Sequence, residues 1–173
     1  MSTYRRRFYT GVGEFWKDFR YILRRRPAIK RAMSGGQLSE AFRERLMLVV
    51  TEVNDCRYCR RFHAAQALQS GVSTDQVQQM MAGQLPTDVP DEEVQALAYA
   101  QHWAEENAHP DSSIVSRTRK HYGEETFQSI EIILRMIRMG NLLGNTWDFI
   151  LHRLTFGRLG GEPQDGYNQA GDR

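Results

Sequence analysis

The chain has 173 residues, of which 40% are hydrophobic and 25% are charged, and its formal net charge at pH 7 is +2. This length and composition fit one globular domain, and they exclude a disordered chain, a collagen-like chain and a small disulfide scaffold. No apolar run approaches the ~20 residues that cross a bilayer, and no apolar stretch follows the first arginines as in a secretory signal. We therefore expect a cytoplasmic protein.

The small net charge hides an uneven distribution. Residues 1–33 hold ten Lys/Arg and two Asp/Glu, a charge of +8, whereas residues 34–173 hold thirteen and nineteen, a charge of −6. Phe15, Phe19 and Ile22 follow helical spacing, which predicts an amphipathic helix over residues 14–31. A basic amphipathic helix is compatible with a membrane surface or with nucleic acid. We favour packing against the core or a neighbouring subunit, and we expect no nucleic-acid partner.

The rest of the chain shows no internal repeat and no reliable strand pattern. Apolar periodicity and cap residues predict helices over residues 38–53, 56–70, 74–82, 92–108, 112–122 and 124–156. Ser39 and Asp55 are the expected N-caps of the first two, and Val94 and Trp103 are expected to point inward. The sequence therefore predicts an all-α fold, with a basic arm at 1–33, a helical domain at 34–156 and a flexible glycine-rich tail at 157–173.

Two features of the last predicted helix bear on packing. Gly140 and Gly144 indicate a bend or a close packing point. Asn141, Asn145 and Asp148 share one face by their spacing, and this face is compatible with a pocket lining, with capping or with subunit contacts.

The two cysteines, Cys56 and Cys59, are too few to stabilise a fold of this size. Residues three apart on a helix have Cα atoms about 5–5.5 Å apart, which is within the range for a disulfide. His63 follows Cys59 by four residues and lies one turn along the same face. The pattern favours a redox-active pair, with a zinc site as the main rival because CxxC is common in zinc sites.

Glu44 joins these residues through a predicted helix hairpin. Asn54 and Asp55 interrupt the apolar pattern, and the midpoint of Glu44 and His63 lies at this break. An antiparallel pair of helices aligns positions that are equidistant from the turn, so we expect Glu44 beside His63. A carboxylate, an imidazole and a thiol in this order can relay a proton.

The chemistry of this group is that of an activated thiol. The positive end of the helix and the arginines at 57, 60 and 61 should favour a thiolate, and His63 can accept the thiol proton while Glu44 orients its ring. The helix terminus favours Cys56 as the first nucleophile, whereas the neighbouring His63 favours Cys59, and spacing does not decide between them.

The order Glu44, eleven residues, Cys56-Arg-Tyr-Cys59, three residues, His63 resembles the signature of the alkylhydroperoxidase D-like (AhpD-like) branch of the carboxymuconolactone decarboxylase superfamily. The resemblance extends over residues 36–155 and includes the segment GNLLGNTWDFILHRL. The decarboxylases proper generally lack the cysteine pair, so its presence argues against lactone decarboxylation.

The resemblance implies an all-helical fold that assembles as trimers or hexamers. It also implies a thiol peroxidase or disulfide reductase in which Cys59 attacks a hydroperoxide or small disulfide substrate and Cys56 resolves the product. The electrons would come from a lipoylated or thioredoxin-like reductant. The alternatives are a non-enzymatic redox sensor or adaptor, in which the disulfide controls assembly or partner binding, and a zinc-binding interaction module.

Overall fold

Seven helices form in the computed structural model, which describes residues 6–160, and no strand occurs among these residues. The all-α prediction is confirmed. The helices are α1 (Val12–Arg24), α2 (Arg26–Met33), α3 (Glu40–Asn54), α4 (Arg57–Gln69), α5 (Thr74–Met81), α6 (Asp91–Glu105) and α7 (Ser112–Leu154). Most of the tail predicted to be flexible, residues 161–173, lies outside the described residues.

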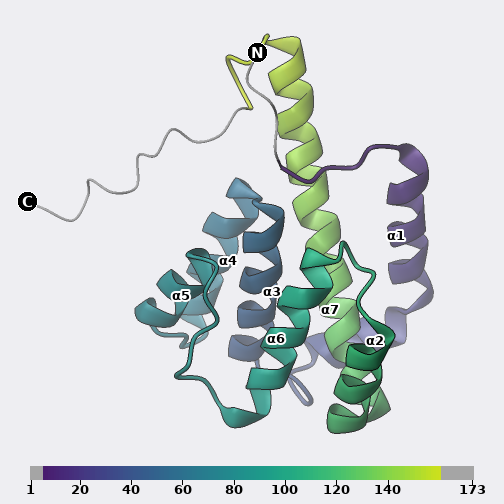
Figure 1. Cartoon of the computed structure of the whole chain (residues 1–173), viewed down its shortest axis with the longest axis vertical. Helices are drawn as coiled ribbons and strands as arrows, with labels where there is room; N and C mark the ends of the chain where they lie inside the picture. Colours follow the sequence, from purple (N-terminus) through teal and green to yellow (C-terminus); the bar gives the residue numbers. More distant parts are fainter. Residues whose placement is uncertain (1–5, 161–173) are drawn as a thin grey trace, which may run out of the picture.

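The long helix α7 organises the molecule. Figure 1 shows it running through the centre, with α1 on one side, α3 to α5 on the other, and its last turns extending beyond its neighbours. Helix α3 packs against α4, α5, α6 and α7, and most of its residues are buried. The core contains large side chains that are fully removed from solvent, among them Leu46, Trp103, Ile130 and Ile133.

One cap prediction and one burial prediction have different outcomes. Ser39 caps α3 by accepting a hydrogen bond from the N–H of Phe42, as predicted. Val94 was expected to point inward and is instead 49% exposed. The neighbouring Glu93 is buried and pairs with Arg45 of α3 at 2.8 Å, which turns α6 so that Val94 faces solvent.

The helix predicted over residues 14–31 is two helices, α1 and α2, which meet at Arg25. Arg25 has φ −112° and ψ 29°, outside the helical region, and Pro27 lies at the start of α2. Proline lacks the N–H that would continue the α1 hydrogen-bond ladder and is well tolerated only in the first turn of a helix. The chain therefore begins a new helix at this point.

The helices predicted at 112–122 and 124–156 are joined as α7, with a kink at Gly123, where φ is 75° and ψ is 164°. This backbone conformation strongly favours glycine. Gly140 and Gly144 keep helical backbone angles, so of the two outcomes considered for them a bend is wrong.

Candidate functional site

The site is built on the turn between α3 and α4. Asp55 ends α3 in the left-handed conformation, with φ 53° and ψ 49°, and this reverses the chain direction. Aspartate tolerates that conformation better than most residues. Its carboxylate accepts hydrogen bonds from Arg6 Nε at 3.2 Å and from Arg60 at 3.1 Å. The hairpin predicted from the break at 54–55 is thus present.

Cys56, rather than the predicted Asp55, is the N-cap of α4. Its Sγ accepts a hydrogen bond from the backbone N–H of Cys59 at 3.4 Å, because Asp55 is occupied in closing α3. The Sγ atoms of Cys56 and Cys59 lie 2.6 Å apart, with both cysteines free. Cys56 has no exposed surface, whereas Cys59 is partly exposed. A small oxidant can therefore reach Cys59 more easily than Cys56.

The two thiols have opposite electrostatic environments. The pKa of Cys56 is lowered to about 7, mainly because the Cys59 thiol donates a hydrogen bond to its sulfur. The backbone N–H groups of Cys59 and Tyr58 and the side chain of Asn141 lower the pKa of Cys56 further, against the opposing effect of burial. The pKa of Cys59 is raised because its proton is held by Cys56 and because the thiol is largely buried. When one of the two thiols loses its proton, these hydrogen bonds therefore favour the negative charge on Cys56 over Cys59.

Two of the three arginines expected to stabilise the thiolate pair with carboxylates instead. Arg57 pairs with Asp148 at 2.7 Å, and Arg60 pairs with Glu52 at 2.9 Å and with Asp55. The low pKa of Cys56 comes from hydrogen bonds, including those of the helix N-terminus, rather than from these cations. The contribution expected from the arginines and the choice of the first nucleophile both stay predictions.

Glu44 and His63 meet across the hairpin as predicted. His63 Nδ1 lies 2.8 Å from Glu44 Oε2, and both side chains are largely buried. When Nδ1–H donates to the carboxylate, Nε2 is left as a proton acceptor. Within the described residues no hydrogen bond joins His63 to either cysteine; Cys59 instead bonds to Cys56. The structure therefore brings the four residues together as two adjacent pairs.

Helix α7 forms the wall behind the cysteines. A Cβ atom added to Gly144 would lie 3.0 Å from Cys56 Sγ and 3.5 Å from a ring carbon of Tyr58, so Gly144 is a close packing point. Asn141, one turn earlier, is fully buried; it accepts from Asn54 Nδ2 at 3.2 Å and donates to Thr51 Oγ1 at 3.1 Å. These contacts join the end of α3 to α7 beside the sulfur atoms.

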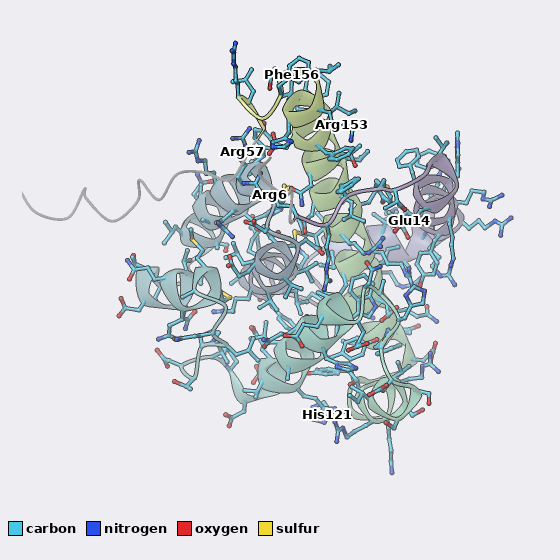
Figure 2. The ribbon with its side chains drawn as sticks, turned by 45° about the horizontal axis from the view of Figure 1, so that its top comes forward. Arg6, Glu14, Arg57, His121, Arg153 and Phe156 are labelled. Carbon is cyan, nitrogen blue, oxygen red and sulfur yellow. The ribbon has the colours of Figure 1, made fainter. Side chains whose placement is uncertain are left out.

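Asp148 completes this polar face of α7. It is fully buried and accepts hydrogen bonds from Arg6 at 2.8 Å, Arg57 at 2.7 Å and the Tyr58 hydroxyl at 2.7 Å. Figure 2 shows Arg6 and Arg57 near each other where α4 and α7 meet. Sequence reasoning placed Asn141, Asn145 and Asp148 on one face but did not connect that face with the cysteines. The sequence signal that could have suggested this connection was their i, i+4, i+7 spacing on α7 beside Gly144.

The amino-terminal segment covers this face. The Tyr9 N–H donates to Thr146 Oγ1 at 3.1 Å, Asn145 Nδ2 donates to the carbonyl of Arg7 at 2.9 Å, and Phe8 stacks on Phe149. Residues of the basic arm thus contact the same helix that backs the cysteines. The domain boundary placed at residue 33 stays a prediction.

A pocket, a metal site and a membrane-spanning helix are three other features that would bear on function. A small pocket between α3, α5 and α6 is lined by Val49, Val53, Met80 and Leu85 among others. Among residues 6–160 no three His, Cys, Asp or Glu side chains are grouped so that they could hold a metal ion. None of the helices described is both long and apolar enough to cross a membrane.

Comparison with known proteins gives one match. Residues 21–102 match the model of the Carboxymuconolactone decarboxylase family. The matched segment contains Glu44, Cys56, Cys59 and His63 and begins within α1. The match supports the carboxymuconolactone decarboxylase superfamily, with which the all-helical fold is consistent. No curated protein and no solved structure gives a significant match.

Proposed function

We propose that this protein is a thiol-dependent redox enzyme of the AhpD-like branch, acting as a peroxidase or disulfide reductase. The observation that carries the proposal is the pair of sulfur atoms 2.6 Å apart at the start of α4, next to a histidine held by a largely buried glutamate. A dithiol in this geometry can close to a disulfide without moving the helix. The superfamily match and the residue pattern support the same reading.

Access decides which cysteine attacks first in this proposal. Cys56 has the lower pKa, but it is fully buried, whereas Cys59 is partly exposed. Oxidation of a thiol follows both thiolate character and exposure. We therefore assign the attack to Cys59 and the resolving step to Cys56, whose low pKa keeps it poised as a thiolate near neutral pH.

His63 supplies the base that Cys59 needs. Its Nε2 takes the Cys59 proton, and the resulting thiolate attacks the terminal oxygen of a hydroperoxide. The O–O bond breaks, the alkoxide leaves with the proton from His63, and Cys59 becomes a sulfenic acid. Glu44 keeps the imidazole oriented and stabilises its protonated form.

Resolution consumes the second thiol. The Cys56 thiolate attacks the Cys59 sulfur, hydroxide leaves and is protonated to water, and the Cys56–Cys59 disulfide forms. A dithiol reductant, of the lipoylated or thioredoxin-like kind, then returns two electrons by thiol–disulfide exchange. With a small disulfide as substrate, the same two thiols deliver the same two electrons.

Stopped-flow oxidation by a hydroperoxide tests the assignment. Cys59→Ser should abolish the rapid phase, whereas Cys56→Ser should keep it and accumulate a sulfenic acid detectable by mass spectrometry. If Cys59→Ser reacts as fast as the unmodified protein, the assignment is wrong. If neither the unmodified protein nor Cys56→Ser reacts faster than free cysteine, the peroxidase proposal fails, and reduction of a small disulfide is then measured.

A redox sensor is the second candidate, and the contacts of Arg6 favour it. Arg6 is buried and pairs with Asp55, which precedes Cys56, and with Asp148, which also holds Arg57 and Tyr58. Closing the disulfide removes the thiolate charge of Cys56 next to these pairs, and in this candidate the change of charge alters how the arm is held. A sensor must change assembly or partner binding on oxidation, so we would compare oligomer size of the reduced and oxidised chain.

We also propose assembly as a trimer or hexamer, as the resemblance implies. The second half of α7 exposes four apolar side chains that recur at helical spacing, Leu143, Trp147, Ile150 and Leu154. The end of this helix extends beyond the other helices (Figure 1). Exposed apolar surface of this kind is typical of subunit interfaces. Light scattering coupled to size exclusion tests this proposal directly.

A further inference from the structure

Helix α1 turns its acidic face toward the protein. Asp18 is buried and pairs with Arg138 of α7, which also binds Glu14 at 3.0 Å. The guanidinium of Arg135 lies 4.1 Å from the ring centre of Tyr21. Figure 2 shows Glu14 between α1 and α7. Buried ion pairs therefore determine which side of α1 faces inward.

Part of the apolar surface of α1 faces outward, whereas Phe15, Phe19 and Ile22 are half-buried. Val12, Trp16 and Leu23 are 72%, 48% and 41% exposed. At 3.6 residues per turn they lie on the side of the helix opposite Glu14 and Tyr21. Figure 1 shows α1 at the edge of the molecule, with α7 as its neighbour on one side. An ordinary amphipathic surface helix buries its apolar face, whereas α1 buries its apolar surface only in part and leaves these three side chains exposed.

Aromatic contacts make this outer face a preformed surface. Trp16 packs edge-on against Phe15 and Phe19, with ring centres 5.8 and 5.5 Å apart, and Phe15 stacks on Phe19 at 5.8 Å. Tryptophan combines a large apolar ring with a polar N–H and is favoured where a protein meets the headgroup region of a membrane.

The exposed charge around this face is entirely basic. Lys17, Arg20 and Arg24 are exposed, and none of them forms an ion pair with another residue between 6 and 160. Glu14 and Asp18, the acidic residues of α1, are paired with Arg138. A partner of this surface must therefore offer negative charge together with a region that accepts apolar side chains.

We propose that α1 docks the protein on an anionic lipid surface, with Val12, Trp16 and Leu23 entering the headgroup boundary and the basic residues contacting lipid phosphates. An interfacial helix needs an apolar face, a basic flank and a fixed orientation, and α1 has all three. A second copy of the same face would bring the same cations together. From the sequence alone we favoured core packing, and Ile22 does pack against the core, whereas Val12, Trp16 and Leu23 remain exposed.

Flotation of the full-length reduced protein with vesicles tests the proposal. The protein should bind phosphatidylcholine vesicles that contain about 30% phosphatidylserine, bind pure phosphatidylcholine much less, and dissociate as salt rises. Trp16→Ser should lower the partition coefficient about tenfold. Arg20→Gln with Arg24→Gln should lower it about 30-fold, because each cation near an anionic leaflet contributes about fivefold.

Matched variants locate the effect on α1. Phe156→Ser removes an exposed aromatic side chain outside α1, and Arg117→Gln with Lys120→Gln removes two exposed cations of α7. Both should keep binding within twofold, with unchanged circular dichroism in every variant. Equal losses in these controls, or no binding to anionic vesicles, would overturn the proposal. A smaller oligomer in Trp16→Ser without lipid binding would assign the face to a second copy instead.

Discussion

Gly144 offers the sharpest test of how α7 and the cysteines depend on each other. Gly144→Ala adds one methyl group, whose carbon would lie 3.0 Å from Cys56 Sγ in the present packing. This is about half an ångström inside ordinary contact distance. Cys56 is fully buried and its sulfur bonds to Cys59, so the sulfur has little room to retreat.

Gly140 is the matched control, since it lies one turn earlier in the same helix and an added Cβ would meet nothing within 4 Å. Alanine at either position gains about 1 kcal/mol of helix propensity over glycine. At Gly144 this gain is opposed by about 1–3 kcal/mol of overpacking. Gly144→Ala should therefore have a free energy of unfolding about 1–3 kcal/mol lower than that of Gly140→Ala.

Urea unfolding of the reduced proteins measures this difference. Stopped-flow oxidation then asks whether the same methyl group slows disulfide formation between Cys56 and Cys59, as expected if it displaces the buried sulfur. Equal stability and equal oxidation rates for Gly144→Ala and Gly140→Ala would show that α7 does not constrain the cysteine pair, and the packing argument would be wrong.

Three further predictions concern the charges of the site and of the arm. Thiolate absorbance at 240 nm should rise with a midpoint near pH 7, and Cys59→Ala should move that midpoint upward, because the hydrogen bond that most lowers the pKa of Cys56 is lost; an unchanged midpoint would contradict this. Glu44→Gln should slow hydroperoxide turnover about tenfold to a hundredfold, because the His63 ring loses the carboxylate that orients it. Glu40→Gln changes an exposed residue of the same helix and should leave turnover unchanged. Asp18→Ala removes one of the two carboxylates that pair with the buried Arg138 of α7. It should lower the free energy of unfolding, measured in urea, by about 3 kcal/mol. A loss under about 1 kcal/mol would show that this pair does not hold α1.

Local sequence patterns were enough to predict the all-helical fold and the contacts within two pairs, Glu44 with His63 and Cys56 with Cys59. The cap at Ser39 follows from residue type and position, and the structure has it. The contact between Glu44 and His63 follows from their equal distance from the break at 54–55, because an antiparallel hairpin has little freedom of register. The i+3 spacing of the cysteines likewise requires only one turn of helix.

The tertiary structure decided how each helix is turned and what surrounds each group. Helix α1 has a plain amphipathic pattern, yet Val12, Trp16 and Leu23 face outward because Asp18 pairs with Arg138, 120 residues away. Contacts between residues far apart in the sequence also turned Val94 outward and placed Gly144 against Cys56. Spacing along the chain determines which residues share a face of a helix, but the direction of that face is determined by packing and by ion pairs between elements far apart in sequence. The sequence by itself therefore determined the helices and the order of carboxylate, imidazole and thiols, and the packing decided which thiol carries the charge and which surface remains open.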